Sequence, residues 1–325
     1  MNQPGIGVVI IGRNEGERLR RCLLSVRTQV ALVVYVDSGS SDGSVALAET
    51  LGVEVVRLDM NKPFTAARAR NEGFACLRQR RPDLAFVQFV DGDCEVVDTW
   101  VGMAVEFLEA NANVAAVCGR RRERFPERSI YNALCDAEWD TPVGETRSCG
   151  GDAMMRIDAL VAVGGFNGRL IAGEEPELCV RLRKAGYLIW RLDAEMTLHD
   201  AAITRFGQWW KRAMRGGYAF AQGAHLHGAA PEYHCVRPLR RLLFWGLALP
   251  LLIVIVAGFF PFGFSLALVY PAQVLRLAVR ADASSGFSWQ QAFFLVLSKF
   301  PETAGAVKFW LHRITGRSGR LIEYK

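Results

Sequence analysis

The chain has 325 residues, 51% of them apolar, which is enough for one large α/β domain or two smaller ones. A formal net charge of +6 and a pI near 9.0 are compatible with nucleic acid, an anionic membrane or a polyphosphate ligand. Because basic residues gather around and beyond the uncharged residues 242–275, their placement favours anionic lipid and argues against nucleic acid.

The first 120 residues alternate short apolar runs with helical patterns, which predicts β-α-β units around a mostly parallel sheet. The expected strands are residues 7–11, 32–36, 54–58, 84–90 and 114–118. Asn14, followed three residues later by Glu17, predicts a capping box for the first helix. Further helices are expected over residues 66–80 and from about Asp98. The N-terminal apolar run is only as long as a strand, so no cleaved signal is expected.

Beyond residue 120 a charged stretch loosens the pattern before further elements follow. We expect helices at residues 157–163, 176–185 and about 204–222, and a strand at 187–192. A boundary near residues 231–238 would separate a catalytic domain, residues 1–235, from a membrane-associated helical region, residues 236–325.

The uncharged residues 242–275 are predicted to form either one tilted membrane span or a re-entrant hairpin. Basic residues on both flanks favour a hairpin that starts and ends in the cytosol. Residues 287–317 mix aromatic and basic side chains and are interpreted as interfacial helices, with a buried core helix as the alternative.

The eight cysteines form no C-x-x-C pair, and several lie inside apolar runs. This pattern indicates reduced core thiols more than a disulfide framework or a zinc site. A cytosolic location follows for the catalytic part.

Polar side chains come directly after the predicted strands, where an open parallel sheet binds its ligands. Glu15 follows the first strand, Asp37 and Asp42 the second, and Asp91 and Asp93 the fourth. Carboxylates gathered at one edge repel each other unless a cation offsets them, which points to a divalent metal, Mg²⁺ or Mn²⁺. Neither G-x-G-x-x-G after the first strand nor G-x-x-x-x-G-K-[ST] is present.

An ordered set of motifs then resembles the family 2 glycosyltransferases, which have the GT-A fold. The matching pieces, spread over about residues 6–222, are VIIGRNE at 9–15, VDSGSSDGS at 36–44, ARNEG at 69–73, VDGD at 90–93, GGF at 164–166 and GEEPEL at 173–178. The resemblance implies that Asp37 holds the nucleobase, Arg70 lies near the base, Asp91 lies near the ribose, and Asp93 binds the metal on the donor diphosphate. The full donor-binding set expected is Asn14, Glu15, Asp37, Ser38, Asp42, Arg70, Asp91 and Gly92.

The same resemblance places the general base at Glu175, where the family pattern has the aspartate of a Glu-Asp pair. Because the extra methylene changes its reach, Glu174 or Glu177 could share the duty. The alternative is that these acids only stabilise the start of a helix that has Pro176 in its first turn. The resemblance implies that His199 is a further metal ligand. The alternative is that His199 has only a structural role.

Arg212 and Arg215 lie in a segment that resembles the region beneath the donor, where either could stabilise the departing diphosphate. The alternative is a membrane-facing amphipathic helix. The acceptor side is assigned to Gly150, Gly151 and Asp152, or else a tight turn, together with Glu177.

These residues predict an inverting, metal-dependent transferase that moves sugar from a nucleoside diphosphate sugar to a saccharide acceptor. The apolar segment suggests a lipid-linked acceptor in surface polysaccharide assembly, at the cytoplasmic face of the plasma membrane, with single additions. The alternatives are transfer to a polyprenyl phosphate and a membrane-bound protein that binds nucleotide sugars without turnover.

Overall fold

The computed structural model describes residues 5–316, and the contacts of the chain divide it into two compact units, Met1–Ala202 and Ile203–Lys325. The boundary between the two units lies before residue 235, where the sequence analysis ended the catalytic domain. The reason is that α8 (Phe206–His227) packs along α13 (Lys299–Ile314) and so belongs to the second unit. The extent of the catalytic domain, placed at residue 235 from the sequence, therefore stays a prediction.

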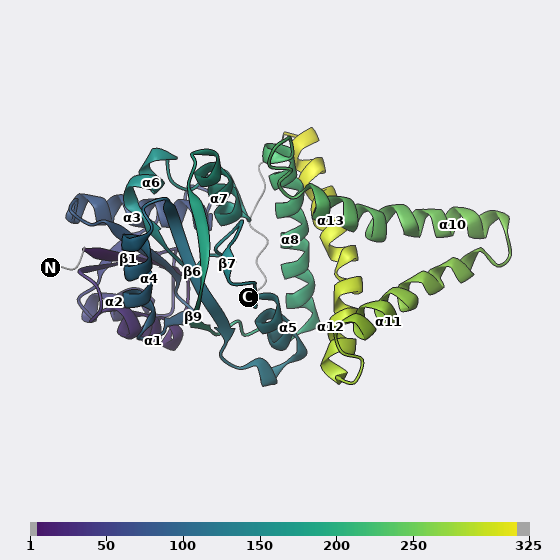
Figure 1. Cartoon of the computed structure of the whole chain (residues 1–325), viewed down its shortest axis with the longest axis horizontal. Coiled ribbons are helices and arrows are strands. Elements are labelled where there is room, and N and C mark those ends of the chain that lie inside the picture. The colour runs from purple at the N-terminus through teal and green to yellow at the C-terminus, as the bar shows by residue number, and fades with distance from the viewer. Residues whose placement is uncertain (1–4, 317–325) are drawn as a thin grey trace. The chain divides into compact units, whose positions relative to one another are not determined.

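A nine-stranded sheet forms the centre of the first unit (Figure 1). Its strands are β1 (Ile6–Gly12), β2 (Leu32–Asp37), β3 (Glu54–Arg57), β4 (Phe86–Asp91), β5 (Cys94–Val96), β6 (Val114–Glu123), β7 (Gly144–Glu145), β8 (Ala153–Arg156) and β9 (Leu188–His199). The order is β3-β2-β1-β4-β8-β6-β9-β5, with β7 on β9. The half from β3 to β4 is parallel, as expected, but β8 runs antiparallel to both β4 and β6. The sheet is thus mixed and not mostly parallel.

The helices of the first unit pack against this sheet, with α3 on β1 and β2 and α4 on β6. They are α1 (Glu17–Val26), α2 (Ser44–Thr50), α3 (Ala66–Arg80), α4 (Trp100–Ala110), the short η1 (Pro126–Arg128), α5 (Ile130–Glu138), α6 (Ile157–Ala162) and α7 (Glu174–Lys184). Strand β1 is buried along nearly its whole length, which explains its continuous apolar run. Trp100 fills the core from α4, and its indole N–H donates to Gln88 over 2.8 Å.

The capping box predicted for α1 is wrong. Gly16, not Asn14, precedes the helix, and no side chain caps it. Asn14 has a positive φ of 57°, a conformation that asparagine tolerates better than most residues. Its side chain accepts a hydrogen bond of 2.7 Å from the backbone N–H of Ser41. Asn14 therefore joins the loops after β1 and β2.

Strand β6 extends to Glu123, through the first part of the stretch that the sequence pattern left without structure. It pairs in parallel with β9, with irregularities in the register between Cys118 and Arg121. The charged side chains of this extension alternate between the faces of the strand, and two of them, Arg121 and Glu123, reach the polar network described below.

In the second unit, α8 and α13 approach closely because glycines lie where they meet. A Cβ on Gly217 would stand 1.8 Å from the carbonyl oxygen of Glu302, and one on Gly305 would stand 1.9 Å from that of Met214. Tyr218 packs edge-on against Phe309 beside them. One face of α13 is therefore buried on α8, while Leu311 and Ile314 remain exposed.

The remaining helices of the second unit are α9 (Val236–Leu243), η2 (Phe244–Ala248), α10 (Leu249–Phe259), η3 (Gly263–Leu268), α11 (Val269–Ala281) and α12 (Gly286–Leu297). Two continuous helical stretches, Val236–Phe259 and Gly263–Ala281, have the length and composition of membrane spans, with mean hydropathy 2.6 and 1.2. They reverse at Pro261 and form the hairpin seen in Figure 1.

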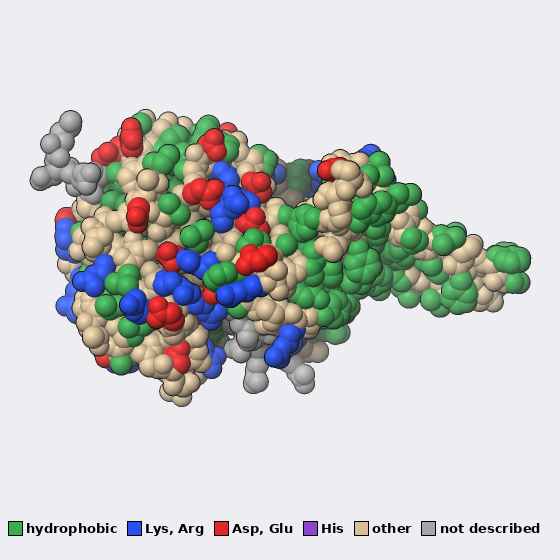
Figure 2. Space-filling view, turned by 90° about the horizontal axis from the view of Figure 1, so that it is seen from below, with side chains coloured by type: hydrophobic (Ala, Val, Ile, Leu, Met, Phe, Trp, Pro, Cys, Tyr) green, Lys and Arg blue, Asp and Glu red, His purple; other side chains and the backbone are tan. Residues whose placement is uncertain are grey.

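The hairpin exposes large apolar side chains, among them Phe259 at 79% and Phe262 at 84%. Figure 2 shows hydrophobic side chains covering it. Its insertion in a membrane, as one tilted span or as a re-entrant hairpin, stays a prediction. The basic residues Arg317, Arg320 and Lys325 lie outside the described residues.

Candidate functional site

The polar site of the first unit lies where β1, β2 and β4 end side by side. Asp37 closes β2 and Asp91 closes β4, and both strands pair in parallel with β1. Gly92 then turns close under β1, because its N–H donates to the carbonyl of Ile11 over 2.8 Å. A Cβ on Gly92 would stand 3.2 Å from that oxygen. Glycine thus lets the turn pass close to the end of β1, just before Asp93.

Asp37 is fixed by the loop that follows it. Its Oδ2 accepts hydrogen bonds from the N–H groups of Gly39 and Ser40 at 2.9 and 3.0 Å, and its Oδ1 accepts one from the hydroxyl of Tyr35 at 3.0 Å. Asp37 and Ser38 are buried. A carboxylate held in this way is rigid, as a residue that recognises a nucleobase must be.

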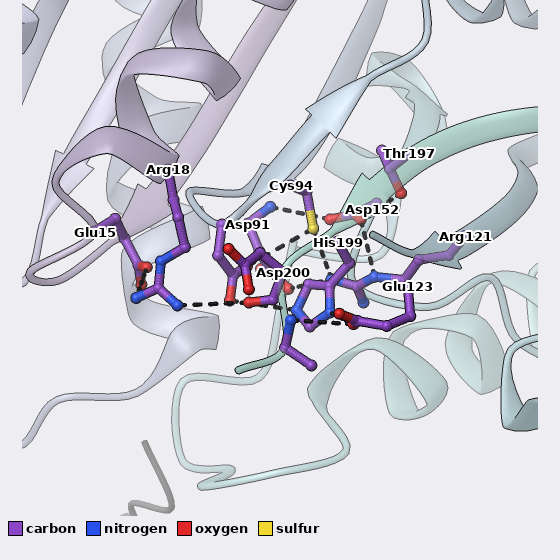
Figure 3. A network of polar contacts seen from close by, with 12 residues as sticks. Glu15, Arg18, Asp91, Cys94, Arg121, Glu123, Asp152, Thr197, His199 and Asp200 are labelled. Atoms are coloured by element: carbon purple, nitrogen blue, oxygen red, sulfur yellow. Dashed lines mark hydrogen bonds and ion pairs between the residues drawn. The ribbon is translucent and has the colours of Figure 1, made fainter. Parts of the chain in front are cut away.

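The loops after β1 and β2 are closed by further acids. Asp42 accepts hydrogen bonds from the N–H and hydroxyl of Ser44. These bonds lower its pKa, although its slight burial acts in the opposite direction. Glu15 pairs with Arg18 at 2.7 Å, and Arg18 also donates to the backbone of Asp200 (Figure 3). Glu15 and Asp42 therefore belong to the same edge of the sheet as Asp37.

Arg70 bridges two of the predicted site acids. It lies on α3, is 2% exposed, and pairs with Asp91 at 2.8 Å and with Glu174 at 2.6 Å. Its guanidinium also lies over the ring of Phe166, 5.6 Å from the centroid. Gly151 sits directly against it, since a Cβ there would stand 2.8 Å from the guanidinium. Arg70 thus contacts Asp91 of the VDGD motif, Phe166 of the GGF motif and Glu174 of the GEEPEL motif.

Asp91, in the network of Figure 3, is paired with two arginines. Arg121 reaches its other oxygen at 3.1 Å, while Arg70 holds the first. Burial would raise the pKa of Asp91, but the two guanidinium groups outweigh it and hold the pKa far below its usual range. Asp91 is therefore ionised at any physiological pH.

Asp93 and His199 lie together at the ends of β4 and β9. The Nε2 of His199 is 3.3 Å from the carboxylate of Asp93, and its Nδ1 is 3.5 Å from that of Glu123. Trp139 packs edge-on against the imidazole. Burial, assisted by the charge of Arg121, lowers the pKa of His199, so the ring is neutral near pH 7. A neutral imidazole beside a carboxylate, with a second carboxylate behind it, is a common metal-binding arrangement.

The donor atoms of Asp93, Cys94 and His199 lie within 4.8 Å of one another and could hold a metal ion together. All three residues are buried. Carboxylate oxygen and imidazole nitrogen suit Mg²⁺ or Mn²⁺, whereas the thiol suits softer ions. The chemistry of Asp93 and His199 therefore fits the divalent metal expected from the sequence.

Asp152 and Glu177, both assigned to the acceptor, are occupied inside the protein. Asp152 accepts hydrogen bonds from the backbone of Asp91 and the hydroxyl of Thr197 and pairs with Arg121. Glu177 is 3% exposed and pairs with Arg181 at 2.9 Å. These contacts are those of positioning residues. That Asp152 or Glu177 contacts an acceptor stays a prediction.

Glu174 and Glu175 start α7 but face different surroundings. Glu174 points to Arg70, while Glu175 is buried and accepts a 2.6 Å hydrogen bond from the backbone N–H of Cys149. Burial raises the pKa of Glu175 above its usual value, against the lowering effect of its hydrogen bonds. The preceding Gly173 has a φ of 75°, a conformation that favours glycine and sets the direction of both acids. Gly150, with a φ of 81°, follows Cys149.

Comparison with known proteins agrees with this geometry. The family model described as Glycosyl transferase family 2 matches residues 7–158, which include the strands that carry Asp37, Asp91 and Asp93. Residues 7–158 therefore form a family 2 glycosyltransferase domain, and the chain is a glycosyltransferase.

Two curated relatives match most of the enzyme. It is 28% identical over 295 residues to the succinoglycan biosynthesis protein ExoA of Rhizobium meliloti, covering 86% of this chain and 83% of that protein. It is 26% identical over 227 residues to the glycosyltransferase AglE of Haloferax volcanii, covering 66% and 72%.

A solved structure confirms the fold of the enzyme. The mannosyltransferase PcManGT of Pyrobaculum calidifontis, solved with GDP-Man and Mn²⁺, superimposes with a TM-score of 0.63 at 20% identity, covering 95% of this chain and 88% of that one. The glycosyltransferase therefore has the GT-A fold, with C-terminal helices beyond it.

Three contributors to the site of this glycosyltransferase were missed from the sequence: Arg121, Glu123 and Trp139. Arg121 links Asp91 to Asp152, and Glu123 stands behind His199. The alternation of arginine and glutamate through residues 120–124 was the available signal, because it has the period of a strand. No local sequence pattern indicates Trp139 as a site residue, because it reaches the site only through its position at the end of α5.

Arg212 and Arg215, predicted to act on the departing diphosphate, lie on α8 in the second unit. Their hydrogen-bonding role at the donor stays a prediction, as does the alternative of a membrane-facing helix. Their neighbour Trp209 is buried against Phe294 of α12, so this part of α8 packs within its own unit.

Proposed function

We propose that this glycosyltransferase moves a sugar from a nucleoside diphosphate sugar to an acceptor hydroxyl with inversion, using Mg²⁺ or Mn²⁺. The observation that carries the proposal is the joining of Asp37, Asp91 and Asp93 at the ends of parallel strands, with His199 beside Asp93. A nucleoside diphosphate needs a rigid acceptor for its base, a contact for its ribose and a cation for its phosphates. These residues offer all three in that order.

Asp93 and His199 would hold the metal, with Glu123 orienting the imidazole from the other side. When bound, the ion neutralises the diphosphate and the charge that develops on it as it leaves. Arg121 and Arg70 keep Asp91 ionised and fixed, so that it can accept hydrogen bonds from the ribose hydroxyls.

Glu175 is proposed as the general base that takes the proton of the acceptor hydroxyl. Its raised pKa suits this step, because a buried carboxylate binds a proton more readily than an exposed one. The backbone N–H of Cys149 fixes its direction. Glu174 balances the charge of Arg70 and is therefore proposed as a positioning residue. Gly150 and Gly151, next to Cys149, would leave room for the acceptor.

The acceptor is proposed to be lipid-linked, at the cytoplasmic face of the plasma membrane. The support is the exposed apolar hairpin of the second unit, together with a relative whose name assigns it to succinoglycan biosynthesis. The enzyme is accordingly proposed to add single sugars during the assembly of a bacterial surface polysaccharide. A polyprenyl phosphate acceptor is the second candidate, since the same hairpin would serve it equally.

The experiment compares sugar transfer by the purified full chain and its Glu175→Gln, Glu175→Asp and Glu106→Gln variants. UDP- and GDP-sugars serve as donors, membrane lipid extract as acceptor, and mass spectrometry detects the product. Glu175→Gln should lose at least a hundredfold in rate, because general base catalysis contributes about 10²–10⁴-fold. Glu175→Asp should retain activity, and the exposed Glu106 on α4 is the control.

Wild-type turnover in Glu175→Gln with a saccharide acceptor would contradict the assignment of the base. Retained activity of this variant with a polyprenyl phosphate alone would favour the second candidate. That acceptor is already anionic and needs no base.

A further inference from the structure

A second cluster of metal-binding groups lies at the start of α7, distinct from Asp93 and His199. Its members are Cys149, Glu175 and Cys179. All three are buried, at 6%, 5% and 0% exposure. Cys179 follows Glu175 by one helical turn, so both side chains project from the same face of α7 toward Cys149.

The three donor atoms form a compact triangle. The two sulfur atoms are 3.6 Å apart, and Oε1 of Glu175 lies 3.2 Å from Sγ of Cys149 and 2.9 Å from Sγ of Cys179. The proposed role of Glu175 as a general base gives no reason for the two thiols to lie beside it. The backbone N–H of Cys149 already donates to this oxygen of Glu175. Because an S–H is a weaker donor than an N–H, the carboxylate does not need the two thiols to satisfy it.

We propose that Cys149, Cys179 and Glu175 form a binding site for Zn²⁺ or a similar thiophilic cation. Zn²⁺ binds thiolate sulfur at about 2.3 Å, so two sulfurs on one tetrahedral ion stand about 3.8 Å apart. The observed 3.6 Å is within a few tenths of an ångström of that separation. Three protein ligands leave the fourth position to a water molecule.

Binding exchanges protons for the ion. Each thiol loses its proton to solvent as a sulfur–zinc bond forms, and Glu175 contributes a carboxylate oxygen. Two thiolates and one carboxylate then surround a doubly charged cation, which leaves one net negative charge in the buried cluster. No oxidant or reductant is needed.

A disulfide between the two cysteines fits the surroundings less well. A disulfide needs its two sulfur atoms about 2.05 Å apart. The observed separation of 3.6 Å is much closer to that of two sulfurs bound to one metal ion.

The ion would act as an inhibitor of transfer, and this part of the inference rests on the proposed role of Glu175. An oxygen that is bound to Zn²⁺ cannot accept the proton of an acceptor hydroxyl. The cluster would therefore couple transfer to the supply of thiophilic metal. Binding itself does not depend on the role of Glu175.

The test uses Co²⁺ and then Zn²⁺ on the reduced full chain. Thiolate-bound Co²⁺ has a charge-transfer band in the near ultraviolet, which reports cysteine ligation without any activity measurement. The variants are Cys149→Ser, Cys179→Ser, Asp93→Ala and, as a control on α3, Cys76→Ser. Circular dichroism checks that each is folded.

We expect the cobalt band in the wild type, Asp93→Ala and Cys76→Ser, and its loss in both Cys149→Ser and Cys179→Ser. One equivalent of Zn²⁺ should abolish the band and reduce transfer at least tenfold in the presence of excess Mn²⁺. Zinc should no longer inhibit the folded Cys179→Ser variant to that extent.

Absence of the band from the wild type, or its survival in both the Cys149→Ser and Cys179→Ser variants, would overturn the site. Binding without inhibition would overturn the regulatory role. If Glu175→Gln also proved fully active, the failure would lie with the proposed base and not with the metal site.

Discussion

Replacing Arg70 with methionine should destabilise the first unit strongly. Arg70 is 2% exposed and holds Asp91 at 2.8 Å and Glu174 at 2.6 Å. Methionine keeps most of the apolar stem but removes the charge. Asp91 would still pair with Arg121, whereas Glu174 would lose its ion pair with Arg70.

Removing one partner from a buried ion pair costs about 3–5 kcal/mol, because the other charge stays buried. The side chains of Asp91 and Glu174 are 29% and 12% exposed, so water offsets part of the loss. We therefore expect the low end, about 3 kcal/mol. For a unit of this size that corresponds to a fall of roughly 6–12 °C in the unfolding temperature.

The matched control lies on the same helix. Arg80 pairs with Glu54 at 2.7 Å, but the two side chains are 60% and 33% exposed. Solvent screens an exposed pair, so Arg80→Met should lower the unfolding temperature far less than Arg70→Met. Thermal unfolding of the two variants, followed by circular dichroism, measures the difference. Equal shifts would refute the reasoning that burial makes Arg70 important.

Three further predictions concern other parts of the chain. Gly73→Ala should destabilise the protein by about 1–3 kcal/mol, because the new Cβ would stand 2.4 Å from a core valine. Gly102 lies in open space on α4, so Gly102→Ala should stabilise the protein slightly. Thermal unfolding compares the two variants. Glu123→Gln should weaken Mn²⁺ binding about 10–100-fold by calorimetry, because it removes the carboxylate behind His199, and unchanged affinity would contradict that role. Changing Phe259 and Phe262 together to aspartate should reduce flotation with anionic liposomes, and full flotation would exclude the hairpin tip from the membrane contact.

Much of the first unit could be predicted because β1, β2 and β4 are buried on both faces. Each such strand reads as a continuous apolar run, and the acids that follow it mark the ligand edge of the sheet. Asp37, Asp91 and Asp93 were located in this way. The ordered motifs then supplied Arg70, and the family resemblance suggested His199.

The rest depended on contacts between distant segments. Asn14 looked like a helix cap, but its side chain binds the loop after β2, 27 residues away. Asp152 and Glu177 were assigned to the acceptor side, yet both are held by arginines that the local pattern does not indicate. The antiparallel insertion of β8 between β4 and β6 likewise follows from tertiary pairing and not from local propensity.

The most direct measurement for the central claim is metal-dependent donor cleavage by the purified chain. Nucleoside diphosphate release from UDP- and GDP-sugars is followed by mass spectrometry, with EDTA and then with added Mn²⁺ or Mg²⁺. We predict that release stops on chelation and returns with the metal in the wild type, but not in a folded Asp93→Ala variant. Release by Asp93→Ala at the wild-type rate, or release unaffected by EDTA, would contradict a metal site at Asp93 and His199.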